Sequence, residues 1–203
     1  MRLPVNVRRF RSHGSPRRKL PLVATTNLRI AQIAENADFE SVQAFRPGEW
    51  SRVEAFRPRV VAGPAPSLRE LAERVELNVI DLSSVDHAVF VLTGCGDAPL
   101  QDVLRVVLWQ TFGVPVYELF VAGRGLVAAS ECETHEGWHV SPGAAFSIVS
   151  GELIFDGFGR KSVRTGLTGW IEQTPCACGR EGARLLDVEQ HETHPARRLA
   201  ATA

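Results

Sequence analysis

The chain has 203 residues, of which 44% are hydrophobic and 23% are charged. A globular chain of this length buries roughly 70% of its unfolded surface, and its composition excludes wholesale disorder, collagen-like repeats and a long coiled coil. No run of apolar residues approaches the length of a transmembrane helix, and the N-terminus lacks the apolar stretch of a signal peptide. We therefore expect a cytoplasmic protein that does not insert into a membrane.

The formal net charge of zero hides a basic N-terminal arm, residues 1–19, which carries seven basic residues and no acidic one. The remaining chain is correspondingly acidic. Such an arm suits nucleic acid or an acidic partner. However, the arm contains neither aromatic repeats nor Gly-Arg repeats, so we rank nucleic-acid binding last and expect a solvated arm or one folded over the acidic body.

Strand-like and helix-like segments alternate over residues 20–122. Residues 20–37 predict a strand, a turn and a helix, with Asn27 as the helix N-cap. The tetrapeptide AFRP occurs twice within residues 38–58, which is too little for a solenoid repeat. Residues 59–63 then predict a buried strand, followed by a helix that Ser67 caps.

The same alternation continues toward the middle of the chain. Residues 87–94 predict a central strand, residues 99–113 an amphipathic helix closed by Gly113, and residues 115–122 another strand. The fold class is therefore α/β, with a mostly parallel sheet flanked by helices. Short glycine-rich runs in residues 123–186 predict a smaller antiparallel β subdomain, and residues 187–203 a loose tail.

The chemically most informative pattern is Cys132-x6-His139 followed by Cys176-x-Cys178. Structural zinc sites take four sulfur or nitrogen ligands, and Cys3His is a common set. Glycines beside both pairs permit the tight turns that direct two ligands to one point. Open alternatives are buried structural cysteines with a satisfied histidine, redox use of the close pair, or His135 as the ligand instead of His139. Cys95, between two glycines, is expected to be a free thiol.

Several motifs resemble phenylacetate-CoA ligases, which belong to the adenylate-forming (AMP-binding) superfamily. They occur in family order over residues 56–186: GDAPL (96–100), FGVPVYELF (112–120), the segment around Cys132 and His139, GELIF (151–155), VRTG (163–166) and CACGR (176–180). The resemblance implies part of an adenylation-domain core, ATP-dependent activation of a carboxylate, and transfer of the acyl group to CoA. It also implies zinc at Cys132, His139, Cys176 and Cys178, and nucleotide contacts from Ser15, Arg17, Lys19, Gly96, Asp97, Phe120 and Arg164.

The positions that carry adenylation depart from the family pattern. The segment resembling the phosphate loop has one glycine and a proline that removes a backbone donor. Arg124 stands where the family has a magnesium-binding glutamate, and Leu167 stands where an aspartate binds the ribose. We also expect the family's C-terminal domain, which supplies a catalytic lysine, to be absent after CACGR.

These departures favour a non-catalytic, zinc-binding module that binds a partner protein, a second copy of itself, or a small acyl or nucleotide ligand. ATP or AMP binding is not expected in the family's usual form. One alternative is a carboxylate-activating ligase whose site is rewired or completed by a partner. The other is a zinc-containing nucleic-acid binder that acts through the basic arm.

Overall fold

The structure is a computed structural model of the whole chain, and it describes residues 28–35, 42–123 and 125–191. The basic arm, the strand expected from Leu20, the Asn27 cap, Arg124 and residues 192–203 of the expected tail lie outside the described residues.

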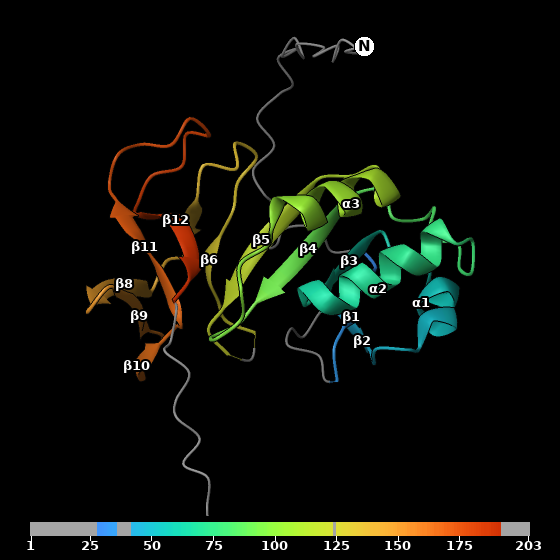
Figure 1. Cartoon of the computed structure of the whole chain (residues 1–203), viewed down its shortest axis with the longest axis horizontal. Coiled ribbons are helices and arrows are strands. Elements are labelled where there is room, and N and C mark those ends of the chain that lie inside the picture. Colours follow the sequence, from blue (N-terminus) through green and yellow to red (C-terminus); the bar gives the residue numbers. More distant parts are fainter. Residues whose placement is uncertain (1–27, 36–41, 124, 192–203) are drawn as a thin grey trace, which may run out of the picture.

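Nine strands form one mixed sheet in the order β11-β12-β7-β6-β5-β4-β3-β1-β2 (Figure 1). Its parallel part contains β1 (Ile30–Ile33), β2 (Gln43–Phe45), β3 (Val60–Gly63), β4 (Ala88–Thr93) and β5 (Val116–Val121). The antiparallel part contains β6 (Val127–Ser130), β7 (Trp138–Val140), β11 (Leu167–Glu172) and β12 (Arg184–Gln190). A separate antiparallel sheet contains β8 (Ala144–Val149), β9 (Glu152–Gly157) and β10 (Arg160–Arg164).

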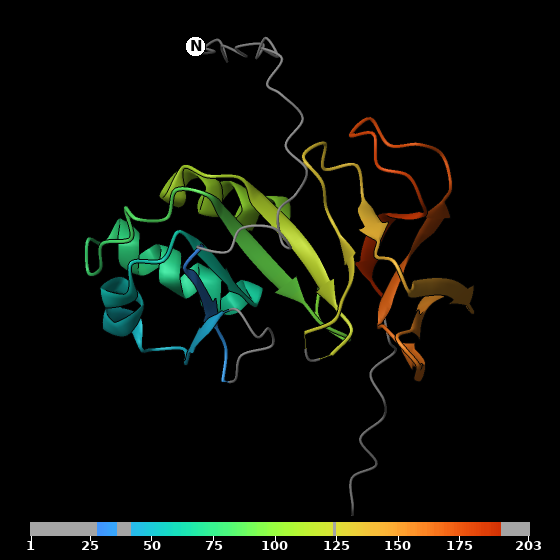
Figure 2. The same cartoon turned by 180° about the vertical axis from the view of Figure 1, so that it is seen from behind.

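The helices α1 (Trp50–Phe56), α2 (Ala65–Glu76) and α3 (Asp102–Phe112) lie on one face of the parallel part (Figures 1 and 2). Leucines at helical spacing in α2 and α3 pack on alternate strand residues such as Val89 and Val91, which makes the main core. Among the described residues, no helix is long and apolar enough to cross a membrane.

The strands and helices predicted between residues 59 and 122 are confirmed, and most of their ends lie within one to three residues of the predicted ones. Gly113 ends α3 in the left-handed conformation, with φ of 67°. The predicted Ser67 cap is wrong, because α2 begins at Ala65 after Pro64, which makes no side-chain cap. The fixed φ of proline suits the first helical turn, and Pro66 reinforces that start.

The helix expected within residues 28–37 is wrong, because residues 30–33 form β1. This strand pairs in parallel with β2 on one side and β3 on the other. Ala31, Gln32 and Ile33 are fully buried there. A short apolar run has no period that separates a buried strand from a helix, and pairing with two neighbouring strands decides between them.

The antiparallel half is not a separate subdomain. Strands β6, β7, β12 and β11 continue the main sheet beyond β5, and only β8–β10 form a sheet of their own. Phe120 of β5 packs in one core with Trp138 of β7 and Phe155 of β9, so the two halves share buried contacts. Residues 187–190 of the expected loose tail belong to β12, where Gln190 pairs with Leu167.

Candidate metal centre and cavity

Three loops or strands bring the predicted ligands together. Cys132 follows β6, His139 lies in β7, and Cys176 and Cys178 lie in the segment that joins β11 to β12. One ligand atom from each residue lies within 4.8 Å of the others. Cys132, His139 and Cys176 are buried, and Cys178 is half-buried. The four predicted ligands therefore form one cluster among the described residues.

The spacing of these atoms fits a tetrahedral metal ion. The Sγ atoms of Cys132 and Cys176 lie 3.8 Å apart, and Cys178 Sγ lies 3.4 Å from His139 Nε2. Zinc bonds of about 2.3 Å to sulfur and 2.0–2.1 Å to nitrogen would place such pairs about 3.8 Å and about 3.6 Å apart in a tetrahedron. The donor set therefore fits zinc in both chemistry and size.

Glycine turns direct the ligands toward one another, as the sequence predicts. Gly137 has φ of 84°, and a Cβ atom there would lie 2.4 Å from the carbonyl oxygen of Leu185. No other amino acid fits that position without moving the backbone. In the second loop, the amide of Gly179 donates to the carbonyl of Cys176 and closes a turn. Both turns hold their ligand pairs close to β7 and β12.

The surroundings of the cluster favour deprotonated ligands at two of its members. Burial opposes ionisation of Cys176, but hydrogen bonds from Thr134 and Cys178 outweigh it and lower the pKa of this thiol to about 7. Burial lowers the pKa of His139, and the positive charges of Arg180 and Arg184 lower it further. His139 Nδ1 is buried and has no hydrogen-bond partner in the described part of the chain. A neutral imidazole, as metal ligation requires, is thereby favoured.

The pKa of Cys178, the fourth member of the cluster, shifts in the opposite direction. Burial raises the pKa of the Cys178 thiol to about 11, although the backbone amide of Arg180 donates to its sulfur over 3.4 Å. Three neighbouring thiolates without a cation would repel one another, so one thiol keeps its proton. A bound divalent ion supplies the charge that lets all three ionise.

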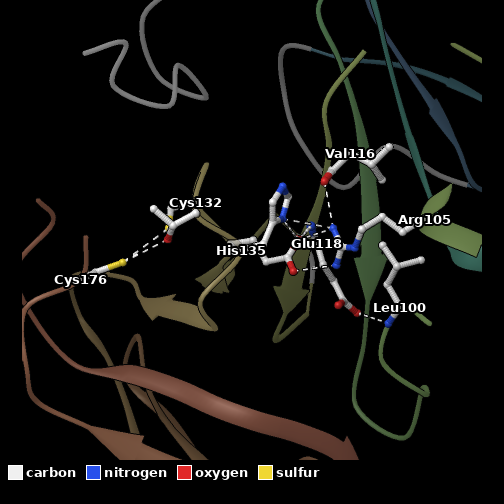
Figure 3. A network of polar contacts seen from close by, with 9 residues as sticks. Leu100, Arg105, Val116, Glu118, Cys132, His135 and Cys176 are labelled. Carbon is white, nitrogen blue, oxygen red and sulfur yellow. Dashed lines mark hydrogen bonds and ion pairs between the residues drawn. The ribbon is translucent and has the colours of Figure 1, made fainter. Parts of the chain in front are cut away.

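His135 does not join the cluster, which selects His139 among the two predicted candidates. Its ring stacks on Tyr117 with centroids 5.6 Å apart, and its Nδ1 atom lies 3.6 Å from a carboxylate oxygen of Glu131. Figure 3 shows His135 directed toward Arg105, away from Cys132 and Cys176. The backbone of His135 is left-handed, with φ of 53°, and its side chain points away from the four clustered residues.

An ion pair anchors the segment between β6 and β7, residues 131–137 (the metal loop), to the sheet and to α3. Arg105 donates to both carboxylate oxygens of Glu131, over 2.9 and 2.7 Å. It also donates to the carbonyl of Val116 (Figure 3). Glu131 in turn accepts the backbone N–H of Glu118 over 2.7 Å. Burial opposes ionisation of Glu131, but the hydrogen bonds from His135 and Arg105 outweigh it and lower its pKa.

Glu118 is a buried acid that the sequence analysis did not single out. It is 2% exposed, and its Oε1 atom accepts hydrogen bonds from the hydroxyl of Thr93 and from the amide of Leu100, the latter over 2.7 Å. Burial raises its pKa to about 7. A lone acid within the apolar strand VYELFV was the available signal.

A cavity of about 490 Å³ opens beside Thr93. It is lined by the residue that follows β3, the end of β4, the start of α2, and residues just before and within α3. Its charged lining residues are Arg69 and Asp97. These elements place it at the carboxyl ends of the parallel strands. The metal loop follows β6, which runs antiparallel to β5, and therefore lies at the opposite edge of the sheet (Figure 1).

The structure separates the described residues to which nucleotide contacts were assigned. Asp97 lines the cavity, and its carboxylate accepts the amide of Gly94 over 2.8 Å. Gly96 lies in the same loop and donates to the carbonyl of Thr165. Arg164 is an exposed residue paired with Glu152 and does not line the cavity.

The remaining assignments are either buried or beyond the described residues. Phe120 is fully buried and stacks on Trp138, with centroids 5.9 Å apart, so its ring offers no surface to a ligand. Leu167, at the family's ribose-binding position, is 1% exposed and belongs to the same core. Ser15, Arg17 and Lys19 lie outside the described residues.

Comparison of the sequence with protein-family models and with curated proteins finds no match. Solved structures do match. An open form of 2-hydroxyisobutyryl-CoA ligase, in complex with 2-HIB-AMP and CoA, superposes with a TM-score of 0.61 at 13% identity and covers 80% of this chain and 45% of that one.

Two further ligases have similar structures. Coronafacic acid ligase from Pectobacterium brasiliense has a TM-score of 0.52 at 12% identity, covering 80% of this chain and 39% of its own. The anthranilate CoA ligase AuaEII, in complex with anthranoyl-AMP, has a TM-score of 0.53 at 12% identity, covering 78% and 39%. The chain thus has a fold shared with acyl- and aryl-CoA ligases, as the resemblance implied, and it spans less than half the length of these ligases.

Proposed function

We propose that this chain is a zinc-stapled binding module on part of the adenylate-forming fold, and that it does not itself activate carboxylates. The observation that carries the proposal is the separation of the metal cluster from the cavity, at opposite edges of one sheet. A metal ion held at the opposite edge of the sheet takes no part in chemistry at the cavity. Four protein ligands also leave no open position for water or substrate.

The cavity is the proposed ligand site. Crevices at the carboxyl ends of parallel strands are the usual binding places in open α/β sheets, and small-molecule sites commonly have volumes of about 300–1,000 Å³. The apolar lining suits an acyl or aryl group, while Arg69 offers a cation to a carboxylate or phosphate. We therefore propose a small acyl or aryl acid, or a nucleotide derivative of one, as the ligand.

The absence of adenylation is proposed from the substituted positions. Leu167 is buried and offers no acceptor to a ribose, and the sequence places Arg124 where a magnesium-binding carboxylate is expected. Losing one such stabilising group typically costs about 2.7–4 kcal/mol of barrier, and several are replaced together.

Pyrophosphate exchange with ATP and a panel of acyl and aryl acids tests this proposal, together with thermal-shift binding of the same acids. We expect no exchange above background and a raised melting temperature with at least one acid. Arg69→Gln should weaken that shift if the ligand is anionic. Robust exchange by the isolated chain would contradict the non-catalytic proposal.

Metal content is tested separately by native mass spectrometry. We expect one zinc ion per chain, lost in Cys176→Ser and retained in the matched control Cys95→Ser, because Cys95 lies outside the cluster and is exposed. Zinc-free native protein, or zinc retained in Cys176→Ser, would overturn the assignment.

The alternative function is a ligase completed by a partner protein or by a second copy of the chain. It is favoured by the fold that this chain shares with the matched ligases. It predicts that ATP raises the melting temperature and that a co-purifying chain restores pyrophosphate exchange. A lack of both effects would exclude it.

A further inference from the structure

A single hydroxyl group lies between two of the cluster's buried sulfurs. The Oγ1 atom of Thr134 is 3.0 Å from Cys132 Sγ and 3.3 Å from Cys176 Sγ. These sulfurs come from loops more than forty residues apart, and their residues are 0% and 5% exposed. The hydroxyl is held there by the turn in which the amide of His135 donates to the carbonyl of Cys132.

Buried thiolates need hydrogen-bond donors, because water does not reach them. Three thiolates carry more negative charge than one divalent ion neutralises, so charge remains on the sulfurs after the metal binds. Cys178 has its donor in the backbone amide of Arg180. Cys176 accepts a hydrogen bond from the backbone of Cys178. Thr134 is the polar side chain positioned to donate to both Cys132 and Cys176.

Glu136 acts on Cys176 in the opposite direction. One of its carboxylate oxygens lies 3.9 Å from Cys176 Sγ, where it accepts from a thiol but repels a thiolate. The Glu136 side chain is 56% exposed and lies 3.8 Å from Arg184, so solvent and this arginine weaken its effect. Thr134 therefore offers this sulfur a hydrogen-bond donor, whereas Glu136 offers it only an acceptor.

We propose that Thr134 is a positioning residue of the metal centre, whose hydroxyl donates to the thiolates of Cys132 and Cys176 and thereby sets metal affinity and release. The inference rests on the proposed zinc site and adds a residue outside the four ligands. Groups that hydrogen-bond metal ligands typically change affinity by 10–100-fold when removed. The hydroxyl, rather than the volume of the side chain, carries the effect.

The experiment measures Zn²⁺ affinity by chelator competition, release rate, and the thiolate-to-metal absorption of the Co²⁺-loaded protein. Thr134→Val keeps the shape of the side chain and removes the donor, so we expect about tenfold weaker Zn²⁺ binding, faster release and a shifted Co²⁺ band. Thr134→Ser retains the donor and should stay within about threefold of the wild type. Thr111→Val, in α3, is the matched control for loss of a half-buried hydroxyl.

Glu136→Gln removes a negative charge beside Cys176 and should therefore change Zn²⁺ affinity in the opposite direction to Thr134→Val. We expect it to bind Zn²⁺ as tightly as the wild type or more tightly. Unfolding of the metal-free proteins distinguishes a folding defect, because Thr134→Val and Thr111→Val should then behave alike. Wild-type affinity in Thr134→Val, or equal loss in Thr134→Ser, would overturn the role of the hydroxyl while leaving zinc binding intact. A wild-type protein that binds neither ion would overturn the zinc site itself.

Discussion

At the scale of single residues, Glu118 is the described acid whose environment most opposes its charge. It lies in β5 with its carboxylate between the end of β4 and the segment leading to α3. The guanidinium of Arg105 is engaged by Glu131, so no cation pairs with Glu118 among the described residues. Its pKa of about 7 means that the buried group changes charge near neutral pH.

The raised pKa predicts how stability depends on pH. Below the unfolded-state pKa of about 4.5, Glu118 is protonated in both the folded and the unfolded protein, and its full contribution to the unfolding free energy is present. That contribution is lost as the pH rises through the folded-state pKa of about 7. The difference corresponds to about 3 kcal/mol of unfolding free energy. Glu118→Gln should remove this fall, because the amide oxygen still accepts both hydrogen bonds and carries no charge.

Denaturant unfolding of the wild type and of Glu118→Gln between pH 5 and 8, with zinc added in excess to both, measures the effect. Glu73→Gln, at an exposed position of α2, is the control and should keep the wild-type profile. An unchanged fall in Glu118→Gln would show that another group titrates in this range.

At the scale of elements, the pair Arg105–Glu131 joins α3, β5 and the segment after β6. The side chains are 22% and 6% exposed, so removing one partner leaves a buried charge. Arg105→Met should therefore lower the unfolding free energy by about 3 kcal/mol or more. Adding Glu131→Gln should recover part of the loss, since the unpaired carboxylate is then gone.

The exposed pair Arg59–Asp86 provides the comparison. Its side chains are 45% and 54% exposed, so solvent screens the pair, and Arg59→Met should lower the unfolding free energy much less than Arg105→Met does. Equal effects of Arg59→Met and Arg105→Met in denaturant unfolding would contradict the account of Arg105 as a buried anchor.

At the scale of the whole molecule, one sheet crosses both halves of the chain, while all four members of the Cys/His cluster belong to the antiparallel half. Zinc binding contributes about 10–16 kcal/mol in small peptide sites, which is comparable with the 5–15 kcal/mol stability of a typical domain. If zinc binds to the cluster as proposed, its removal should therefore affect the two halves unequally.

Hydrogen exchange after chelation checks this expectation. Amides of β7, β11 and β12 should lose protection first, because their connecting loops hold the ligands. Amides of β3, β4 and β5 should keep theirs, since α2 and α3 cover them with an independent core. Uniform loss of protection across the sheet, or no loss in β7 and β12, would contradict a metal ion that stabilises mainly the antiparallel half.

The sequence alone determined the features that depend on short segments. Alternating strand and helix patterns predicted β3, α2, β4, α3 and β5, and Gly113 marked the end of α3. The cysteine and histidine spacing predicted all four members of the cluster, because ligand chemistry and turn glycines are visible residue by residue.

Only the tertiary structure decided what depends on distant segments meeting. It made residues 30–33 a strand, joined the antiparallel strands to the main sheet, and chose His139 over His135. It also placed the cavity and the cluster at opposite edges, and put Glu118 and Thr134 among their partners. Burial and hydrogen bonding across the sheet are properties of the packed chain, and a local pattern does not contain them.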